Sequence, residues 1–252
     1  AGVVLLKHAK QNNFTQVALM LEHTSWGRSN KQSLEQAALQ LGLNITHLEW
    51  FNWRDSEMAN KVTRVIATQP QAIILVANAP EGAEIVKAMH KLPTNLHKPI
   101  ISHWGITSGN FIEQVGLDII RQSDIRVLQT FSFFTAENMQ KSTRVLQAYN
   151  QKYQTDYTAQ TVPSAVGIAH AYDLVHMLAQ AIRQAKTTES SAVHNALENL
   201  PQYQGLVKTY KRAFSANKHD ALEPDDYHVF AFDNFGYLSN IPSVSRAAKI
   251  IQ

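Results

Sequence analysis

Two segments of this 252-residue sequence place a tryptophan and a glycine directly after an apolar run. The first segment is Thr24–Gly27 (TSWG), and the second is Ser102–Gly105 (SHWG). Hydroxyl and imidazole groups can hydrogen-bond a polar ligand while a flat indole packs against its apolar part. Where such a turn begins a helix, the first backbone N–H groups can also receive a carboxylate or an amide oxygen. The two segments therefore predict a binding site for a small molecule.

Both tryptophans also have a purely structural interpretation. Thr24 or Ser25 could cap the following helix beside a Trp26 that packs on the surface. Trp104 could simply fill space at an interface between lobes, and Gly105 is expected to let the chain turn sharply beside it. The residue types alone leave these alternatives open.

The sequence contains 11 histidines but none of the common catalytic or nucleotide-binding motifs. It lacks H-E-x-x-H, G-x-S-x-G, the P-loop and G-x-G-x-x-G, so we expect no enzyme. One segment, KHDALEPDDYH, gathers potential metal ligands, but its spacing matches no strong metal motif. We interpret it as a structural turn with Asp220 or Asp225 as a cap, and expect neither a metal nor another cofactor. The potential ligands in this segment are His219, Asp220, Asp225, Asp226 and His228.

The bulk composition, 44% hydrophobic and 17% charged, is that of a globular chain with one large or two modest cores. The net charge of +3 comes from scattered Lys and Arg residues, which argues against a nucleic-acid partner. The absence of cysteine excludes disulfides and thiolate sites and fits an oxidising compartment. No apolar run approaches the ~20 residues of a membrane-spanning helix, and the first residues do not resemble a signal peptide. Because the sequence begins without Met, we expect a mature or trimmed product.

The first half of the sequence alternates continuous apolar runs with amphipathic helical patterns. Such runs are typical of parallel strands that are covered on both faces. Two helical patterns end at Gly42 and Pro70, and a third begins at Pro80. The alternation predicts an α/β fold with an open, doubly wound parallel sheet and right-handed crossovers. The predicted strands are Gln16–Leu21, Ile45–Phe51, Ala72–Ala77, Pro99–Ser102 and Ile125–Phe133.

The second half of the sequence is mainly helical and ends in a hairpin. Alternating aromatic residues around Asp233–Gly236 predict this β-hairpin. We divide the chain into an α/β lobe (1–132), a helical crossover segment (133–222) and a returning hairpin with a tail (223–252). The predicted helices of the second half are Ala136–Tyr153, Ser164–Gln184 and Glu189–Leu200.

The order of these segments resembles the C-terminal lobe of type I periplasmic binding proteins, above all the branched-chain amino acid and amide receptors of ABC importers. The match begins with VALMLEHTSWGRSN, LGLNITHLEWF and DSEMANKVTRVIATQPQAIILVANAPEGAEIVKAM. It continues with AYNQKYQTDYTAQTVPSAVGIAHAYDLVHMLAQAI and YQGLVKTYKRAFSANKHDALEPDDYHVFAFDNFG, so that it spans nearly the whole chain. The resemblance implies a Rossmann-like lobe and a missing N-terminal lobe. The helices after Phe133 would pack on that missing lobe.

The resemblance also implies which residues face the ligand. Trp26 occupies the place of a binding aromatic residue, and Glu81 lies close to the cleft. Amino-acid-binding members carry an acid near the turn of Trp104, whereas no Asp or Glu occurs between Pro99 and Asn110. A buried ammonium without an anionic partner is costly, so an aromatic, amide-like or weakly cationic ligand fits better. The aromatic run Trp50–Trp53 is expected to lie in the core. The predicted ligand-binding residues are Thr24, Ser25, Trp26, Ala79, Glu81, His103 and Trp104.

The implied function is binding of an amino acid, an amide or an aromatic compound by a periplasmic solute receptor that feeds an ABC importer. Two lobes would close on the ligand, with Phe131–Phe134 acting as a hinge crossing. The alternative is an extracytoplasmic sensing domain of a membrane signalling receptor. The partner would then be a membrane signalling module instead of an ABC permease. A third class, an interaction module built from this half alone, would require that the chain dimerise without binding a small molecule.

Overall fold

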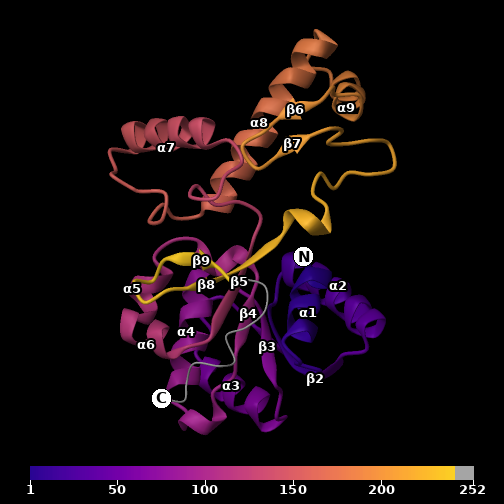
Figure 1. Cartoon of the computed structure of the whole chain (residues 1–252). Helices are drawn as coiled ribbons and strands as arrows, with labels where there is room; N and C mark the ends of the chain where they lie inside the picture. The colour runs from indigo at the N-terminus through magenta and orange to yellow at the C-terminus, as the bar shows by residue number, and fades with distance from the viewer. Residues whose placement is uncertain (242–252) are drawn as a thin grey trace. The chain divides into compact units, whose positions relative to one another are not determined.

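The computed structural model describes residues 1–241, which form two compact units (Figure 1). Unit 1 comprises Ala1–Leu128 together with residues 228–241. Unit 2 comprises Gln129–Tyr227. The chain therefore leaves unit 1 and later returns to it, and each unit has a hydrophobic core of its own.

Unit 1 is built on a seven-stranded sheet in the order β2-β1-β3-β4-β5-β8-β9. Strands β1 to β5 pair in parallel, and the strand order reverses at β1, which lies between β2 and β3. This arrangement confirms the predicted doubly wound α/β sheet. The strands of the parallel part are β1 (Gln16–Glu22), β2 (Asn44–Phe51), β3 (Ala72–Val76), β4 (Ile100–Ser102) and β5 (Ile125–Gln129).

Helices connect the strands of unit 1, and α1 packs on α2 while α3 packs on α4. As predicted, α2 ends at Gly42, whose φ of 67° lies in the left-handed region that favours glycine. Pro80 lies in the first turn of α4, also as predicted. The helical segments of unit 1 are α1 (Gly2–Gln11), α2 (Ser25–Leu41), α3 (Met58–Ala67), α4 (Ala79–His90), η1 (Thr94–Leu96), η2 (Trp104–Thr107), α5 (Phe111–Val115) and α6 (Leu117–Gln122).

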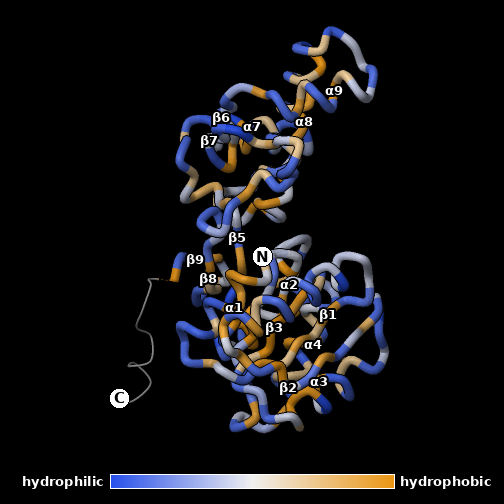
Figure 2. Tube along the Cα trace, turned by 90° about the vertical axis from the view of Figure 1, so that its right-hand side faces the viewer, coloured by the Kyte–Doolittle hydropathy of each residue, from blue (hydrophilic) through white to orange (hydrophobic). Residues whose placement is uncertain are grey.

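The central strands of unit 1 are apolar along almost their whole length. All five residues of β3 and the last six residues of β1 are buried. Figure 2 shows hydrophobic residues gathered along the strands of this unit. Because both faces of a doubly wound sheet are covered by helices, polar groups must collect where the strands end.

Two predictions about apolar segments are wrong in part. The predicted strand Ile125–Phe133 ends at Gln129, because Phe131 and Phe133 belong to the core of unit 2 instead of the sheet. Their rings meet edge to face at 4.9 Å in that core. Their alternation in the sequence is what prolonged the predicted strand. Trp53 is not a core residue, since 67% of it is exposed, whereas Phe51 is fully buried. The hinge role of Phe131–Phe134 stays a prediction.

Unit 2 is organised around a buried carboxylate on its longest helix. Asp173 on α8 accepts hydrogen bonds from the main-chain N–H groups of Leu206 and Val207 and from the hydroxyl of Tyr210. This carboxylate fixes the turn between β6 and β7 against the helix and satisfies two buried N–H groups.

Within residues 1–241, no helix has both the length and the apolar composition needed to cross a membrane. The elements of unit 2 are α7 (Met139–Tyr153), α8 (Ala165–Ala185), α9 (Ser190–Glu198), β6 (Tyr203–Gln204), β7 (Thr209–Tyr210) and η3 (Pro224–Asp226).

The described part of the chain ends with the predicted hairpin, formed by β8 (His228–Phe232) and β9 (Leu238–Asn240). The carboxylate of Asp233 accepts hydrogen bonds from the N–H groups of Phe235 and Tyr237. Gly236 has a φ of 81°, a conformation that favours glycine. The turn joins β8 to β9, and the two strands pair antiparallel at the edge of the sheet.

The predicted capping residue of the turn before β8 is wrong. Neither Asp220 nor Asp225 caps it. Instead, the Asp226 carboxylate accepts the N–H of Glu223 within a capping box around η3, at 2.6 Å. The same carboxylate pairs with Lys208. Position within the helical turn, rather than residue type, decides which acid can reach back to the first N–H.

We expect Asp173→Ala to destabilise unit 2 by about 3–5 kcal/mol, because it leaves two buried N–H groups and a hydroxyl without an acceptor. Hydrogen exchange at the amides of Leu206 and Val207 should accelerate in parallel. Asp156→Ala, which removes an exposed carboxylate, is the matched control and should leave both measurements unchanged. Unaltered protection of these two amides in Asp173→Ala would contradict the assignment.

Candidate functional site

Three neighbouring strands of the parallel sheet end at one edge, and each is followed by polar or aromatic residues. β1, β3 and β4 are adjacent in the sheet, so the turns after their carboxyl ends lie side by side. Thr24–Gly27 follows β1, Asn78 and Ala79 follow β3, and His103 and Trp104 follow β4. The sheet thus brings both tryptophan–glycine segments to the same edge.

Two tryptophans and a histidine form an aromatic cluster at this edge. The His103 ring lies 3.8 Å from the ring of Trp104, and it meets Trp26 edge to face at 5.0 Å. Trp26 and Trp104 are both partly exposed, whereas His103 is buried between them. The cluster therefore presents partly exposed indoles around a buried imidazole, an arrangement suited to packing against a flat ligand.

The glycines beside the tryptophans are required by close approaches of the main chain. A Cβ at Gly27 would lie 1.8 Å from the carbonyl oxygen of Glu22. A Cβ at Gly105 would lie 2.3 Å from the carbonyl oxygen of Ala77 and 2.7 Å from Cη2 of Trp26. The expected reason for Gly105, a sharp turn, is therefore replaced by a steric one. The indole of Trp26 rests directly on the main chain at Gly105.

His103 is uncharged at neutral pH. Burial lowers the pKa of its imidazole from the ordinary value of 6.5 to about 3. Its Nδ1 is buried and has no hydrogen-bond partner among residues 1–241. The ring therefore brings no positive charge to the site at neutral pH.

The predicted ligand-binding residues at the starts of α2 and α4 differ in exposure and in their contacts. The Thr24 hydroxyl accepts a hydrogen bond from the N–H of Gly27 at 3.3 Å and so caps α2. Ser25 is exposed, and Ala79 is buried at the first position of α4. A capping role for Thr24 is the structural alternative foreseen from the sequence. The part of all three residues in ligand binding stays a prediction.

Glu22 is the functional candidate that the sequence analysis missed. It is the last residue of β1 and is only 2% exposed, and its Oε2 accepts a hydrogen bond from Nδ2 of Asn78 at 3.0 Å. Asn78 is the N-cap of α4 but uses its amide for this contact rather than to cap the helix. A single charged residue at the end of an unbroken apolar strand was the available signal. The edge therefore contains an acid, although the turn of Trp104 does not.

Glu81 makes its hydrogen bond with the loop that follows β2. It is buried, and its Oε1 accepts a hydrogen bond from the main-chain N–H of Arg54 at 3.2 Å. Arg54 belongs to the loop that follows β2, on the other side of β1 from β3. Glu81 thus holds a loop, and its predicted contact with a ligand stays untested.

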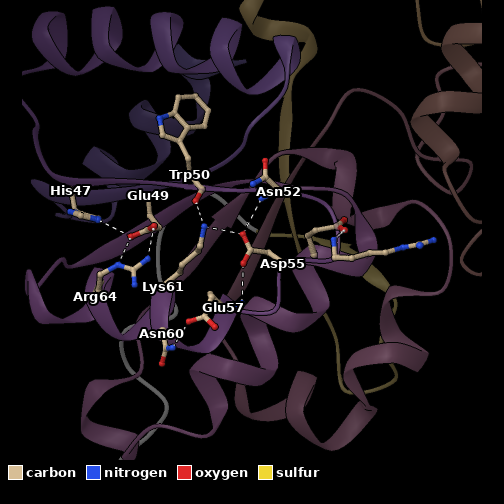
Figure 3. Close-up of polar contacts among 11 residues, drawn as sticks. His47, Glu49, Trp50, Asn52, Asp55, Glu57, Asn60, Lys61 and Arg64 are labelled. Atoms are coloured by element: carbon tan, nitrogen blue, oxygen red, sulfur yellow. Dashed lines mark hydrogen bonds and ion pairs between the residues drawn. The ribbon is translucent and has the colours of Figure 1, made fainter.

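A polar network keeps that loop in place, as Figure 3 shows. Lys61 on α3 bridges the carbonyl oxygen of Trp50 at 2.7 Å and the carboxylate of Asp55 at 2.9 Å. The Asp55 carboxylate also accepts the N–H groups of Asn52 and Glu57. The Lys61 contact, supported by these N–H groups, lowers the pKa of Asp55 below its ordinary range. The network is structural, because Lys61 and Asp55 bind each other and the main-chain groups of the loop.

The comparisons with known proteins identify the family and the fold. A family model described as "Periplasmic binding protein" matches residues 2–229. A periplasmic binding protein type 1 from Bordetella pertussis Tohama I superposes with a TM-score of 0.80 at 22% identity, covering 95% of this chain and 65% of that one. A branched-chain amino acid transporter substrate binding protein from Streptococcus pneumoniae, in complex with isoleucine, gives 0.72 at 20% identity, with 95% and 64% covered. A fatty acid ABC transporter substrate-binding protein from Thermomonospora curvata gives 0.75 at 15% identity, with 95% and 61% covered.

The present chain therefore spans less than two thirds of the length of these three structures. At identities below 25%, the likeness to them establishes the fold alone. A comparison with curated protein sequences finds no match.

The buried imidazole of His103 should make the stability of unit 1 fall in mild acid. The unfolded chain takes up this proton near pH 6.5 and the folded chain only near pH 3, so the contribution is complete above pH 6.5 and is lost as the pH falls toward 3. Between pH 7 and pH 5 we expect a loss of about 2 kcal/mol from this group. His8, whose pKa burial lowers to about 4, adds a similar loss.

Urea unfolding followed by tryptophan fluorescence measures this effect, because all four tryptophans lie in unit 1. His103→Phe should reduce the difference in stability between pH 7 and pH 5 by about half, since His8 remains. His23→Phe, at an exposed histidine of the same edge, should retain the full difference. An equal pH dependence in His103→Phe and the wild type would show that His103 is not buried as a neutral ring.

Proposed function

Since this chain belongs to the periplasmic binding protein family, we propose that it is the ligand-binding lobe of an extracytoplasmic solute receptor that feeds an ABC importer. The observation that carries the proposal is the aromatic cluster of Trp26, His103 and Trp104 at the carboxyl edge of the parallel sheet. In open α/β sheets, ligands bind at this edge. The ABC transporter substrate-binding proteins among the similar structures support the choice of an importer.

The chemistry of the edge favours a flat or amide-like ligand. Partly exposed indoles offer apolar faces, and the neutral His103 offers a hydrogen bond without charge. Glu22 supplies a carboxylate at this edge, and Asn78 already occupies one of its oxygens. A small aromatic, amide or weakly cationic molecule suits this set better than a strongly charged one, which would need a full ion pair in a buried site.

A second lobe completes the proposed receptor. Helix α8 of unit 2 carries a line of exposed small and apolar residues at helical spacing, among them Leu174 and Val175, which are 52% and 61% exposed. Exposed apolar surface of this extent indicates a covering partner. The similar structures contain at least a third more chain than this sequence spans, and we assign the cover to that additional lobe. The line consists of Gly167, Ala171, Leu174, Val175 and Leu178.

Ligand binding would act by shifting a population. A ligand that contacts both lobes is bound more tightly when they are closed, so it selects the closed form from an existing equilibrium. A permease that recognises the closed form would then distinguish the loaded receptor from the empty one.

We expect a thermal-shift screen of amino acids, amides and aromatic acids on the full-length receptor to give a ligand that raises the unfolding midpoint. Trp26→Ala and Trp104→Ala should each weaken that ligand by about tenfold or more, because each removes an indole from the cluster. Trp53→Ala is the matched control, since Trp53 is an exposed tryptophan of the same unit outside the cluster. Isothermal titration measures the affinities of the wild type and the three variants. Equal affinity in all four proteins would return both cluster tryptophans to a structural role.

The cover on α8 is tested separately. In the full-length receptor, Val175→Glu should lower stability by about 2–5 kcal/mol, because it would bury an unpaired carboxylate at the proposed interface. Leu39→Glu, at an exposed leucine of α2, should change stability by less than about 0.5 kcal/mol. Denaturant unfolding gives both values. A Val175→Glu receptor as stable as the Leu39→Glu receptor would show that no lobe covers this line.

A further inference from the structure

Three metal-ligating side chains meet at one place on the surface of unit 2. His194 and Glu198 lie on α9 four residues apart, a spacing that puts them on the same face of the helix. His219 comes from the segment that follows β7. Each residue offers one ligand atom, and the three atoms lie within 4.8 Å of one another.

The distances fit a shared ion better than hydrogen bonds. Oε1 of Glu198 lies 3.6 Å from Nε2 of His194 and 3.5 Å from Nε2 of His219. An N–H···O hydrogen bond is shorter, at ~2.7–3.2 Å. Two ligands that share a tetrahedral Zn²⁺ at bond lengths of ~2.0–2.2 Å lie about 3.4 Å apart. The carboxylate is therefore spaced from both imidazoles as a fellow ligand would be.

The electrostatic surroundings also favour a cation. Glu198 is the last residue of α9, where the partial negative charge of the helix end attracts positive charge. Arg212 donates to the main-chain carbonyl of Glu198 at 3.4 Å, and the carboxylate itself faces the two imidazoles. The side chains of His194 and His219 are 64% and 67% exposed, whereas that of Glu198 is 17% exposed. An ion can thus reach the site directly from solvent.

We propose that His194, Glu198 and His219 form a binding site for Zn²⁺. Two imidazoles and a carboxylate are a common zinc ligand set, and water would take the fourth position. Mg²⁺ and Ca²⁺ prefer oxygen ligands alone and suit this set poorly. The ion joins α9 to the segment between β7 and η3, whose regular structure is limited to one bridge between Ser215 and Lys218. Zinc therefore fastens this segment to the helix.

Isothermal titration of ZnCl₂ into the chain tests the site, with the protein free of any histidine tag and treated beforehand with a chelator. We expect one equivalent to bind. The variants His194→Gln, Glu198→Gln and His219→Gln should each weaken binding by at least about tenfold, since each removes one of three protein ligands. His176→Gln, at an exposed histidine on α8, is the matched control and should bind as the wild type does.

A second measurement separates a specific site from loose surface binding. Hydrogen exchange in residues 211–222 should slow when Zn²⁺ is added to the wild type, and should not change in His219→Gln. Mg²⁺ at the same concentration should have no effect. Failure of Zn²⁺ to bind, equal binding in the three ligand variants and the wild type, or unchanged exchange in residues 211–222 would each overturn the proposal and leave a surface ion pair.

Discussion

The burial of the parallel strands on both faces is the constraint from which the rest of unit 1 follows. β1 and β3 have no room for polar side chains along their length, so charged and hydrogen-bonding groups can occur only where these strands end. Parallel pairing then puts all the carboxyl ends at one edge. Glu22, the aromatic cluster and the first turns of α2 and α4 meet there because the sheet leaves them no other place.

In unit 2, one buried carboxylate accepts hydrogen bonds from main-chain groups that no sheet pairs. Its core is built from helices and short strands, and the turn between β6 and β7 has main-chain N–H groups that a sheet would otherwise pair. The Asp173 carboxylate accepts two of them and the Tyr210 hydroxyl. Burial and this negative neighbour together raise the pKa of Tyr210, which keeps that hydroxyl a hydrogen-bond donor. One side chain thus replaces a strand as the partner of this turn.

The sequence predicts those features of the protein that depend on local periodicity. The five parallel strands, the stop at Gly42 and the C-terminal hairpin each follow from patterns within about ten residues of chain. Apart from the cap at η3, where position within one turn decides, the errors arise where distant packing decides the outcome. Phe131 and Phe133 continue a strand pattern but belong to the core of unit 2. Trp53 follows Trp50 and Phe51 closely in the sequence, yet 67% of it is exposed. Glu22 can be recognised locally as a charged residue at the end of an apolar strand, but its burial beside Asn78 depends on the packing of two distant segments.

The contact between Trp26 and the main chain at Gly105 has a consequence for how selectivity could change. In the proposed receptor, the contact of this indole with the main chain would leave it less freedom to lose when a ligand arrives. Such preorganisation improves affinity chiefly by slowing dissociation. Substitutions at Trp26 or Gly105 are therefore a poor route to a new ligand specificity. New specificities would have to arise from the exposed residues around it, such as Ser25, while the two glycines stay fixed.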